Sequence, residues 1–435
     1  MTILLFENVR LIDPAAGLDR PGRLLVRDGA IAGADLPGAE GAPEGAAVID
    51  GGGAILCPGL VDMRVAIGEP GFEYRETVAS AARAAAAGGI TTMAVLPNSQ
   101  PAIDDPALVR LLRARGEETG TVSILPYGAL TRRCEGAEMA EIGLLHEAGA
   151  VAFTDGTRAI ADTRTMRLAL TYARGFDALV VQHPEDPSLA RGGCATDGEL
   201  ATRLGLPGIP AAAEAIMIAR DLRLVELTKG RLHFGHVSTA EGVELIRAAK
   251  ARGLRVTCDT APPYFDLNET AIGDFRTYAK LSPPLRGEAD RQAICAALAD
   301  GTIDAIASDH APCDADDKRQ PFAVAAAGGT GLATLLAVTL AQVHGGSLPM
   351  IEALGLLTHR PAALLGAAAG TLADGRPADL CLFDPDRAWR VDADDMPGRA
   401  QNTPFDGRAL EGRVLGTWKA GRPVFAHPAT GQAAP

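Results

Sequence analysis

The stretch "SAARAAAAGGITTMAVLP", residues 80–97, shows the pattern on which the fold depends. Its alanine-rich first half consists of strong helix formers, and the two glycines that follow are typical of a helix C-terminus. Its second half is apolar or β-branched almost throughout, as a strand buried on both faces must be. The stretch therefore predicts a helix that leads directly into a buried strand.

The same alternation of strand and helix recurs between about residue 55 and residue 312. The segments between the apolar runs show the spacing of apolar residues that is typical of helices, for example "EMAEIGLLHEAG" and "TAEGVELIRAAKARG". The runs are "AILCPGLVDM" (54–63), "TTMAVLP" (91–97), "VSILPYGAL" (122–130), "AVAFTD" (150–155), "ALVVQHPED" (178–186), "LHFGHVST" (232–239), "RVTCDTAP" (255–262) and "IDAIASDHAP" (303–312). Strands that alternate with helices in this way predict an α/β fold, a (β/α)8 TIM-type barrel.

The two ends of the chain follow a different pattern. Short strands with turn signals occur in "LFENVRLID" near the N-terminus and in "ADLCLFDPD" near the C-terminus. Because chain termini often lie close together, we expect the two ends to pair into one small β-sandwich. The predicted organisation is 1–54 for the N-terminal part of this sandwich, 55–367 for the barrel and 368–435 for the C-terminal part.

Composition restricts the class of protein. The chain has 435 residues, of which 47% are hydrophobic and 22% charged, and a formal net charge of −13. This acidic balance argues against nucleic acid as a partner, and no apolar run approaches the roughly 20 residues that span a bilayer. The N-terminus lacks the features of a signal peptide, and the seven cysteines show no paired spacing. We therefore expect a cytoplasmic protein with reduced thiols and no membrane partner.

Several motifs occur in the order of one known family. They are "CPGLVDM", "EPGFEYRETVASAARAAAAGGITTMAVLPNSQP", "HPED" (183–186), "LGLPGIPAAAEAIMIARDLRL" (204–224), "HFGHVST" (233–239), "SPPLRGEADR" (282–291), "IASDHAPCDADDK" (306–318) and "NTPFDGRALEGRV" (402–414). Together they resemble the dihydroorotases of the amidohydrolase superfamily over nearly the whole chain. The resemblance implies zinc at the C-terminal mouth of the barrel and the ring opening of dihydroorotate to carbamoyl aspartate.

Five residues match site positions of that family. The resemblance implies metal-ligand roles for His183, His236 and Asp309, and Asp155 lies near the position of an acidic ligand. In an active member Asp309 would also be the catalytic base. Asn98 matches a substrate-binding asparagine.

Five other residues depart from the family pattern. Arg64 and Ala66 occupy the places of an H-x-H metal-binding pair, and Gly68 stands where an arginine grips the substrate carboxylate. Ser282 replaces an asparagine, and Cys313 replaces a histidine. Cys313 either fills the space of that histidine, which is our interpretation, or supplies a thiolate ligand. His233 and His310 are interpreted as structural residues.

Arg64 is the residue that bears most directly on whether the site binds a metal. A guanidinium is permanently charged and donates only, so it cannot bind zinc. A divalent ion beside it would also repel it. Even two unit charges of the same sign at about 4 Å repel each other by ~4 kcal/mol at an effective dielectric constant of about 20. We expect Arg64 to replace the metal and to pair with Asp309 or Asp155. The alternative is a single zinc held at a reduced site by His183, His236 and Asp309.

Three functions follow from these observations. The first is a dihydroorotase-like protein of pyrimidine biosynthesis that is inactive, binds no zinc and serves as a structural partner of aspartate carbamoyltransferase, with or without self-association. The second is an active cyclic amidohydrolase with one zinc. The third is a metabolite-binding module without catalysis. Because both metal ligands and substrate contacts have changed while packing motifs remain, we favour the first.

Overall fold

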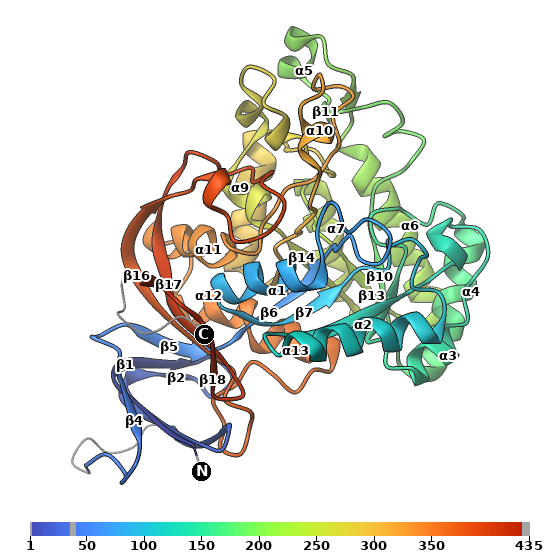
Figure 1. The fold of residues 1–435 in the computed structure, drawn as a ribbon. Coiled ribbons are helices and arrows are strands. Elements are labelled where there is room, and N and C mark those ends of the chain that lie inside the picture. Colours follow the sequence, from blue (N-terminus) through green and yellow to red (C-terminus); the bar gives the residue numbers. More distant parts are fainter. Residues whose placement is uncertain (1, 35–40, 429–435) are drawn as a thin grey trace.

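The computed structural model describes residues 2–34 and 41–428. It contains a parallel eight-stranded barrel in the order β15-β14-β13-β10-β9-β8-β7-β6, surrounded by helices (Figure 1). The barrel is nearly closed by a parallel bridge between Val65 and His310 and by a hydrogen bond from Ala66 N to His310 O of 2.7 Å. The predicted TIM-type barrel is confirmed.

Each predicted apolar run overlaps a barrel strand. These are β6 (Leu60–Val65), β7 (Ile90–Val95), β8 (Ser123–Ala129), β9 (Ala152–Thr154), β10 (Leu179–Gln182), β13 (Arg231–Phe234), β14 (Val256–Thr260) and β15 (Ala305–Ile306). The main helices are α1 (Val78–Ala87), α2 (Pro106–Thr119), α3 (Ile142–Glu147), α4 (Thr163–Ala173), α6 (Ala212–Thr228), α7 (Ala240–Ala251), α9 (Glu288–Ala299), α11 (Leu335–His344), α12 (Met350–Leu357) and α13 (His359–Leu365). Shorter elements are α5 (Glu199–Leu204), α8 (Pro262–Asp266), α10 (Ala315–Lys318), β11 (Ala195–Thr196) and β12 (Gly208–Ile209).

The opening stretch folds as its sequence predicts. Thr77 caps α1, accepting a hydrogen bond from Ser80 N, and the helix ends at Gly88. Gly89 follows with a φ of 82°, a left-handed conformation that suits glycine, and β7 begins at the next residue. Two glycines thus turn the chain from helix to buried strand.

Strands from both termini form one second sheet. It has the order β18-β17-β16-β5-β1-β2-β3, with β4 paired to β1. The strands are β1 (Ile3–Asp13), β2 (Leu18–Arg27), β3 (Ala30–Ala34), β4 (Ala47–Asp50), β5 (Ile55–Pro58), β16 (Leu380–Arg390), β17 (Ala409–Lys419) and β18 (Arg422–Ala426). This sheet encloses a core of its own, in which Phe6 meets Trp418 edge to face with ring centroids 4.9 Å apart. The two ends of the chain therefore pair as expected, although in one continuous sheet.

The boundary of the barrel lies later than the predicted residue 55. The run at 54–63 holds two strands, because β5 pairs with β1 and β16 in the terminal sheet and only β6 enters the barrel. Gly59 separates them, where a Cβ would lie 2.2 Å from the Thr91 side chain. The sequence does not reveal this change from one sheet to the other, because the apolar run is continuous across it.

No helix in the described part of the chain is long and apolar enough to cross a membrane.

Candidate functional site

The candidate site lies at the C-terminal mouth of the barrel, where barrel enzymes keep their functional side chains. Arg64 belongs to β6, whereas His183, His236 and Asp309 follow β10, β13 and β15. These four residues line one cavity of about 350 Å³. The sequence prediction that they meet at this mouth is therefore correct in geometry.

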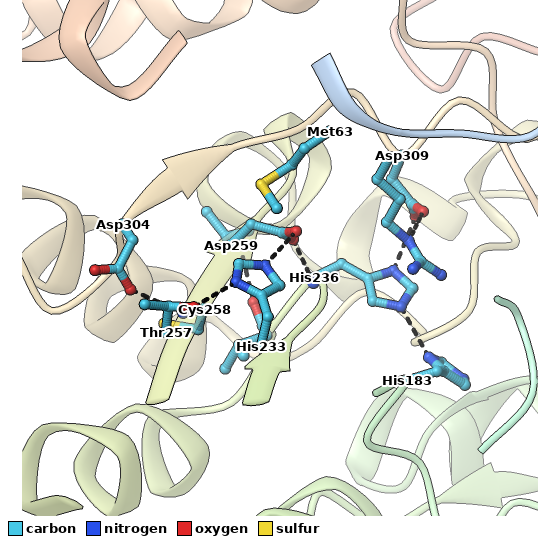
Figure 2. Close-up of polar contacts among 12 residues, drawn as sticks. Met63, His183, His233, His236, Thr257, Cys258, Asp259, Asp304 and Asp309 are labelled. Atoms are coloured by element: carbon cyan, nitrogen blue, oxygen red, sulfur yellow. Dashed lines mark hydrogen bonds and ion pairs between the residues drawn. The ribbon is translucent and has the colours of Figure 1, made fainter. Parts of the chain in front are cut away.

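Polar contacts join the four residues in a chain. Arg64 Nε donates to Asp309 Oδ1 over 2.8 Å, and the other carboxylate oxygen lies 3.2 Å from His236 Nδ1. The second nitrogen of His236, Nε2, lies 2.8 Å from His183 Nδ1. Figure 2 shows Asp309, His236 and His183 along this line. Of the two carboxylates expected to pair with Arg64, Asp309 is the one that does.

The backbone supports this arrangement. His236 and Asp309 both have left-handed backbone conformations, with φ of 43° and 49°. Such conformations are uncommon for residues other than glycine and persist where the surroundings fix them. For His236, the fixing contact is a hydrogen bond from its backbone N–H to Asp259 Oδ1.

Arg64 is buried to the extent that only 1% of the residue is exposed. Its Nη2 donates to the carbonyl of Gly156 over 3.2 Å, while Nη1 has no hydrogen-bond partner in the described part of the chain. A buried guanidinium is tolerated only when it is paired, and Asp309 supplies the opposite charge. The ion pair therefore accounts for the presence of a cation at the barrel mouth.

Burial and charge set the ionisation of this pair. Burial by itself raises the pKa of Asp309, but the contacts with His236 and Arg64 outweigh it and hold that pKa at about 2. Burial lowers the pKa of His236 to about 4, and the positive charge of Arg64 acts in the same direction. At neutral pH the site thus contains an anionic Asp309, a cationic Arg64 and a neutral His236.

These residues do not fit a zinc ion. In the described part of the chain, no three histidine, cysteine or carboxylate side chains gather in a way that could hold a metal. One nitrogen of His236 faces His183, and the carboxylate of Asp309 is engaged by Arg64. The donor set that zinc requires is occupied by contacts within the protein.

Asp155 was expected near an acidic metal-ligand position, and that role stays a prediction because its carboxylate is engaged within the protein. Its carboxylate accepts hydrogen bonds from Thr131 N at 2.8 Å and Gly136 N at 3.1 Å, and from the Thr131 hydroxyl. These contacts close the loop after β8, and Asp155 is not among the residues that line the cavity of His183 and His236. The two partners are more than 18 residues away in sequence, so the short motif "FTDG" could not reveal them.

Asn98 lines the cavity, but both ends of its amide are already bonded. Nδ2 donates to Asp155 O over 2.9 Å, and Oδ1 accepts from Thr157 N over 3.1 Å. Gly156 passes so close that a Cβ there would lie 1.5 Å from Asn98 Oδ1. In this conformation Asn98 holds the loop after β9, and its predicted contact with substrate stays a prediction.

The positions that depart from the family pattern lie around the same cavity. Ala66, Gly68, Ser282 and Cys313 all line it. A Cβ on Gly68 would lie 2.0 Å from the carbonyl oxygen of Phe72, so this tight loop has no room for an arginine at that position. The structure thus explains why a carboxylate grip at this position cannot be restored without moving the loop.

Ser282 and Cys313 have modest roles. Ser282 Oγ is 3.5 Å from Glu185 Oε2, at the limit of a hydrogen bond. Cys313 Sγ lies 3.6 Å and 3.7 Å from two backbone carbonyls, and burial raises the pKa of its thiol. A protonated thiol against carbonyls is a space-filling residue, in agreement with the interpretation from sequence, and is a poor metal ligand.

Sequence reasoning missed Asp259, which supports the site from below. Asp259 Oδ2 lies 2.9 Å from His233 Nε2, and the same carboxylate accepts from the backbone of His236 (Figure 2). His233 is completely buried and also contacts the Thr257 hydroxyl at 2.8 Å. His233 is therefore structural, as expected, and a lone aspartate at the end of the apolar run "RVTCDTAP" was the available signal for its partner.

A second missed carboxylate is Asp62, which precedes Arg64 on β6. Its Oδ1 accepts from Arg64 N and Ser308 N, both at 3.1 Å, and so joins the first and last barrel strands. Burial raises the pKa of Asp62 to about 6. His310 adds to the same closure through its backbone carbonyl, which accepts from Ala66 N over 2.7 Å. Its Nδ1 accepts from Gly331 N over 3.3 Å, a contact that agrees with its expected structural role.

Known proteins resemble this chain along its whole length. The family model "Dihydro-orotase-like" matches residues 53–242. The chain is 46% identical to a dihydroorotase of Pelobacter propionicus and 44% identical to one of Syntrophotalea carbinolica, in each case covering 97% of this chain and 99% of the relative. Among solved structures, the L-hydantoinase (dihydropyrimidinase) of Arthrobacter aurescens is 26% identical, with a TM-score of 0.87 over 98% of this chain and 96% of its own. The identity to the two bacterial relatives, over nearly their entire length, shows that this chain belongs to the dihydroorotase family.

Proposed function

We propose that this chain is a dihydroorotase-like protein of pyrimidine biosynthesis that does not open dihydroorotate and that serves as a structural partner of aspartate carbamoyltransferase. The observation that carries the proposal is the buried ion pair between Arg64 Nε and Asp309 Oδ1 at 2.8 Å. It places a cationic side chain where members of the family are expected to hold zinc, and it occupies the carboxylate expected to act as base.

Hydrogen bonds that hold the loops of the barrel together support a structural role. Glu214, in the retained motif "PAAAEAI", is fully buried, and its carboxylate accepts hydrogen bonds from the backbone and hydroxyl groups of Ser238 and Thr239. Asn402, in the retained motif "NTPFDG", joins the backbone of Cys313 to that of Gly328. These contacts fix the conformation of the loops, and a structural role is enough to explain them.

The partner is proposed from the resemblance of the chain to inactive dihydroorotase-like proteins that associate with the transcarbamoylase. A protein whose function is to shape an assembly must keep its surface and its fold. It can lose metal ligands at little cost if their charges are compensated within the protein, as Arg64 compensates Asp309.

A second function is favoured by a separate observation. The relatives named dihydroorotase share more than two fifths of their residues with this chain over almost their whole length. An active cyclic amidohydrolase with a single zinc would require Arg64 to swing out and release Asp309 for the metal.

One experiment separates the two functions. The purified chain is assayed for ring opening of dihydroorotate with and without added zinc, and is then mixed with purified aspartate carbamoyltransferase from the same organism and fractionated by size. We expect no turnover in either assay and co-elution with the transcarbamoylase. Zinc-dependent turnover that is lost in Asp309→Asn would establish the enzyme instead, and separate elution would refute the proposed partner.

A further inference from the structure

We infer that a cavity between the barrel and the terminal sheet binds a small monocarboxylate with an apolar body. This cavity shares no lining residue with the one at the barrel mouth, and the inference does not rest on the proposed function. Its volume is about 250 Å³. We call it the Trp389 cavity and define it by six of the residues that line it: Leu336, Ala337, Trp389, Met396, Arg413 and Phe425.

The Trp389 cavity lies where a barrel helix meets the terminal sheet. Helix α11 packs against β17, and Figure 1 shows it beside β16 and β17. Leu336 and Ala337 of α11 line one side, whereas Trp389 comes from β16 and Arg413 from β17. The cavity therefore lies between elements whose positions are fixed by regular secondary structure.

The lining of the cavity is mostly apolar. Trp389, Met396 and Phe425 pack against the barrel core, yet each of them is only partly buried. Leu336 and Ala337, by contrast, are almost completely buried. Small-molecule sites are typically concave and apolar, with a few polar groups that fix the ligand. An apolar ligand body would remove the remaining exposed surface of these side chains from water.

The ring of Trp389 is held in place before any ligand binds. Its Nε1 donates to Gly412 O over 2.9 Å. The register between β16 and β17 shifts between Asp384 and Ala388, directly before Trp389. Irregularities of this kind re-aim side chains and are frequent next to functional sites. Because the indole is already fixed, a ligand that packs on it loses little affinity to ordering of the side chain.

Arg413 is a partly buried cation without a counter-charge. Its guanidinium carbon lies 4.1 Å from the centroid of the Trp389 ring, and its side chain forms no ion pair or hydrogen bond with any other described residue. Asp395 is the one acidic residue that lines the cavity, and it is exposed and makes no ion pair with Arg413. Burial and the positive charge of Arg387 both lower the pKa of Arg413. Burying part of a charge without a partner is unfavourable, and an anionic ligand would supply that partner.

The charge and the volume of the cavity define the class of ligand. The single cation Arg413 matches one negative charge, whereas a phosphate group would bring an excess of charge into an apolar cavity. The N–H groups of a guanidinium bind a carboxylate with two parallel hydrogen bonds. A cavity of about 150 Å³ holds benzene, so 250 Å³ suits a body of about eight carbon atoms. Octanoate has both features.

Titration of the full chain with octanoate, followed by tryptophan fluorescence, tests the inference. The chain has two tryptophans, and Trp418 is buried in the core of the terminal sheet, so Trp389 is the one that a ligand in the cavity would contact. We expect a saturable change in fluorescence with a Kd of about 1 mM or lower, as suits a ligand of this size. In Trp389→Phe the fluorescence change should disappear, while calorimetry still detects binding of octanoate.

Matched variants separate the roles of charge and cavity. Arg413→Gln should weaken the binding of octanoate at least ~10-fold, because a charge-assisted contact is lost, and should leave the binding of uncharged 1-octanol unchanged. Arg387→Gln is the control, since it removes the same charge from an exposed residue of β16 that does not line the cavity, and it should change the affinity for octanoate at most ~2-fold. Ala337→Leu fills the cavity and should weaken the binding of both ligands.

Three results would overturn the inference. They are the absence of saturable octanoate binding up to about 10 mM, equal affinities for octanoate and 1-octanol, and an Arg413→Gln variant that binds octanoate as wild type does. Circular dichroism confirms that each variant is folded, and Ala333→Leu, which changes another lining residue, serves if Ala337→Leu is not. Binding of octanoate that persists unchanged in the folded cavity-filling variant would place the ligand elsewhere and would equally refute the inference.

Discussion

Replacing Arg64 with methionine removes a buried cation and leaves Asp309 without its closest opposite charge. The pKa of Asp309 is held at about 2 against an ordinary 3.8, and this difference corresponds to about 2.5 kcal/mol of stability at neutral pH. Arg64 shares that contribution with His236. Removing one member of a buried ion pair, however, typically costs about 3–5 kcal/mol, because the remaining charge is stranded. We therefore expect Arg64→Met to lower the free energy of unfolding by about 3 kcal/mol.

The pair has a clear dependence on pH. Since the folded pKa of Asp309 lies below its ordinary value, the stability that it supplies is fully present above pH 3.8 and is lost as the pH falls toward about 2. The difference in stability between wild type and Arg64→Met should therefore shrink over this acidic range. Urea unfolding at pH 7 and at several acidic values measures it.

A matched control is available at the surface. Arg10 pairs with Asp19 with the same geometry, Nε to Oδ1 at 2.7 Å, but both side chains are partly exposed. Arg10→Met should cost less than about 1 kcal/mol, as exposed ion pairs do. If Arg64→Met costs no more than Arg10→Met, or stabilises the protein, then Arg64 is not the buried counter-charge of Asp309, and the account of the site fails.

Three further predictions concern other parts of the site and its surroundings. The variant Arg64→His/Ala66→His should gain zinc binding but little dihydroorotate turnover, because Gly68 leaves no room for a side chain that grips a carboxylate; substantial turnover would show that this contact is dispensable. Asp259→Asn should cost about 1–3 kcal/mol in urea unfolding, since one of its two acceptor oxygens becomes a donor facing a buried donor; an unchanged midpoint would contradict its supporting role, with Asp19→Asn as the surface control. Burial lowers the pKa of Lys318 from 10.5 to about 8, so the unfolded chain binds more protons between these values and stability should rise with pH there by up to about 3 kcal/mol relative to Lys318→Met; parallel pH profiles for the two proteins would rule this out.

Much of the fold could be predicted because its signals are local. The glycines after the helix at 80–87 and the apolar run that follows specify a helix-to-strand turn without reference to the rest of the chain. The split of 54–63 into two strands could not be read in this way, because both halves are buried and apolar. Only the pairing partners, β16 on one side and β7 on the other, distinguish them.

Contacts in the site could be predicted from the sequence where the chemistry of a residue restricts which partners it can have. A buried arginine at the mouth must find a carboxylate, and the last barrel strand supplies Asp309. Asp155 shows the opposite case, since its partners Thr131 and Gly136 come from a loop whose path depends on the whole barrel. His233 and Asp259 were equally hidden, because strand register brings them together across neighbouring strands.

The zinc content of the purified chain, measured by elemental analysis after equilibration with zinc and removal of the excess, tests the central claim most directly. If Arg64 takes the place of the metal, we expect close to no zinc per wild-type chain and clear zinc uptake by Arg64→His/Ala66→His handled in parallel. One zinc per wild-type chain, lost on replacement of His183 or His236, would show that Arg64 does not take the place of the metal.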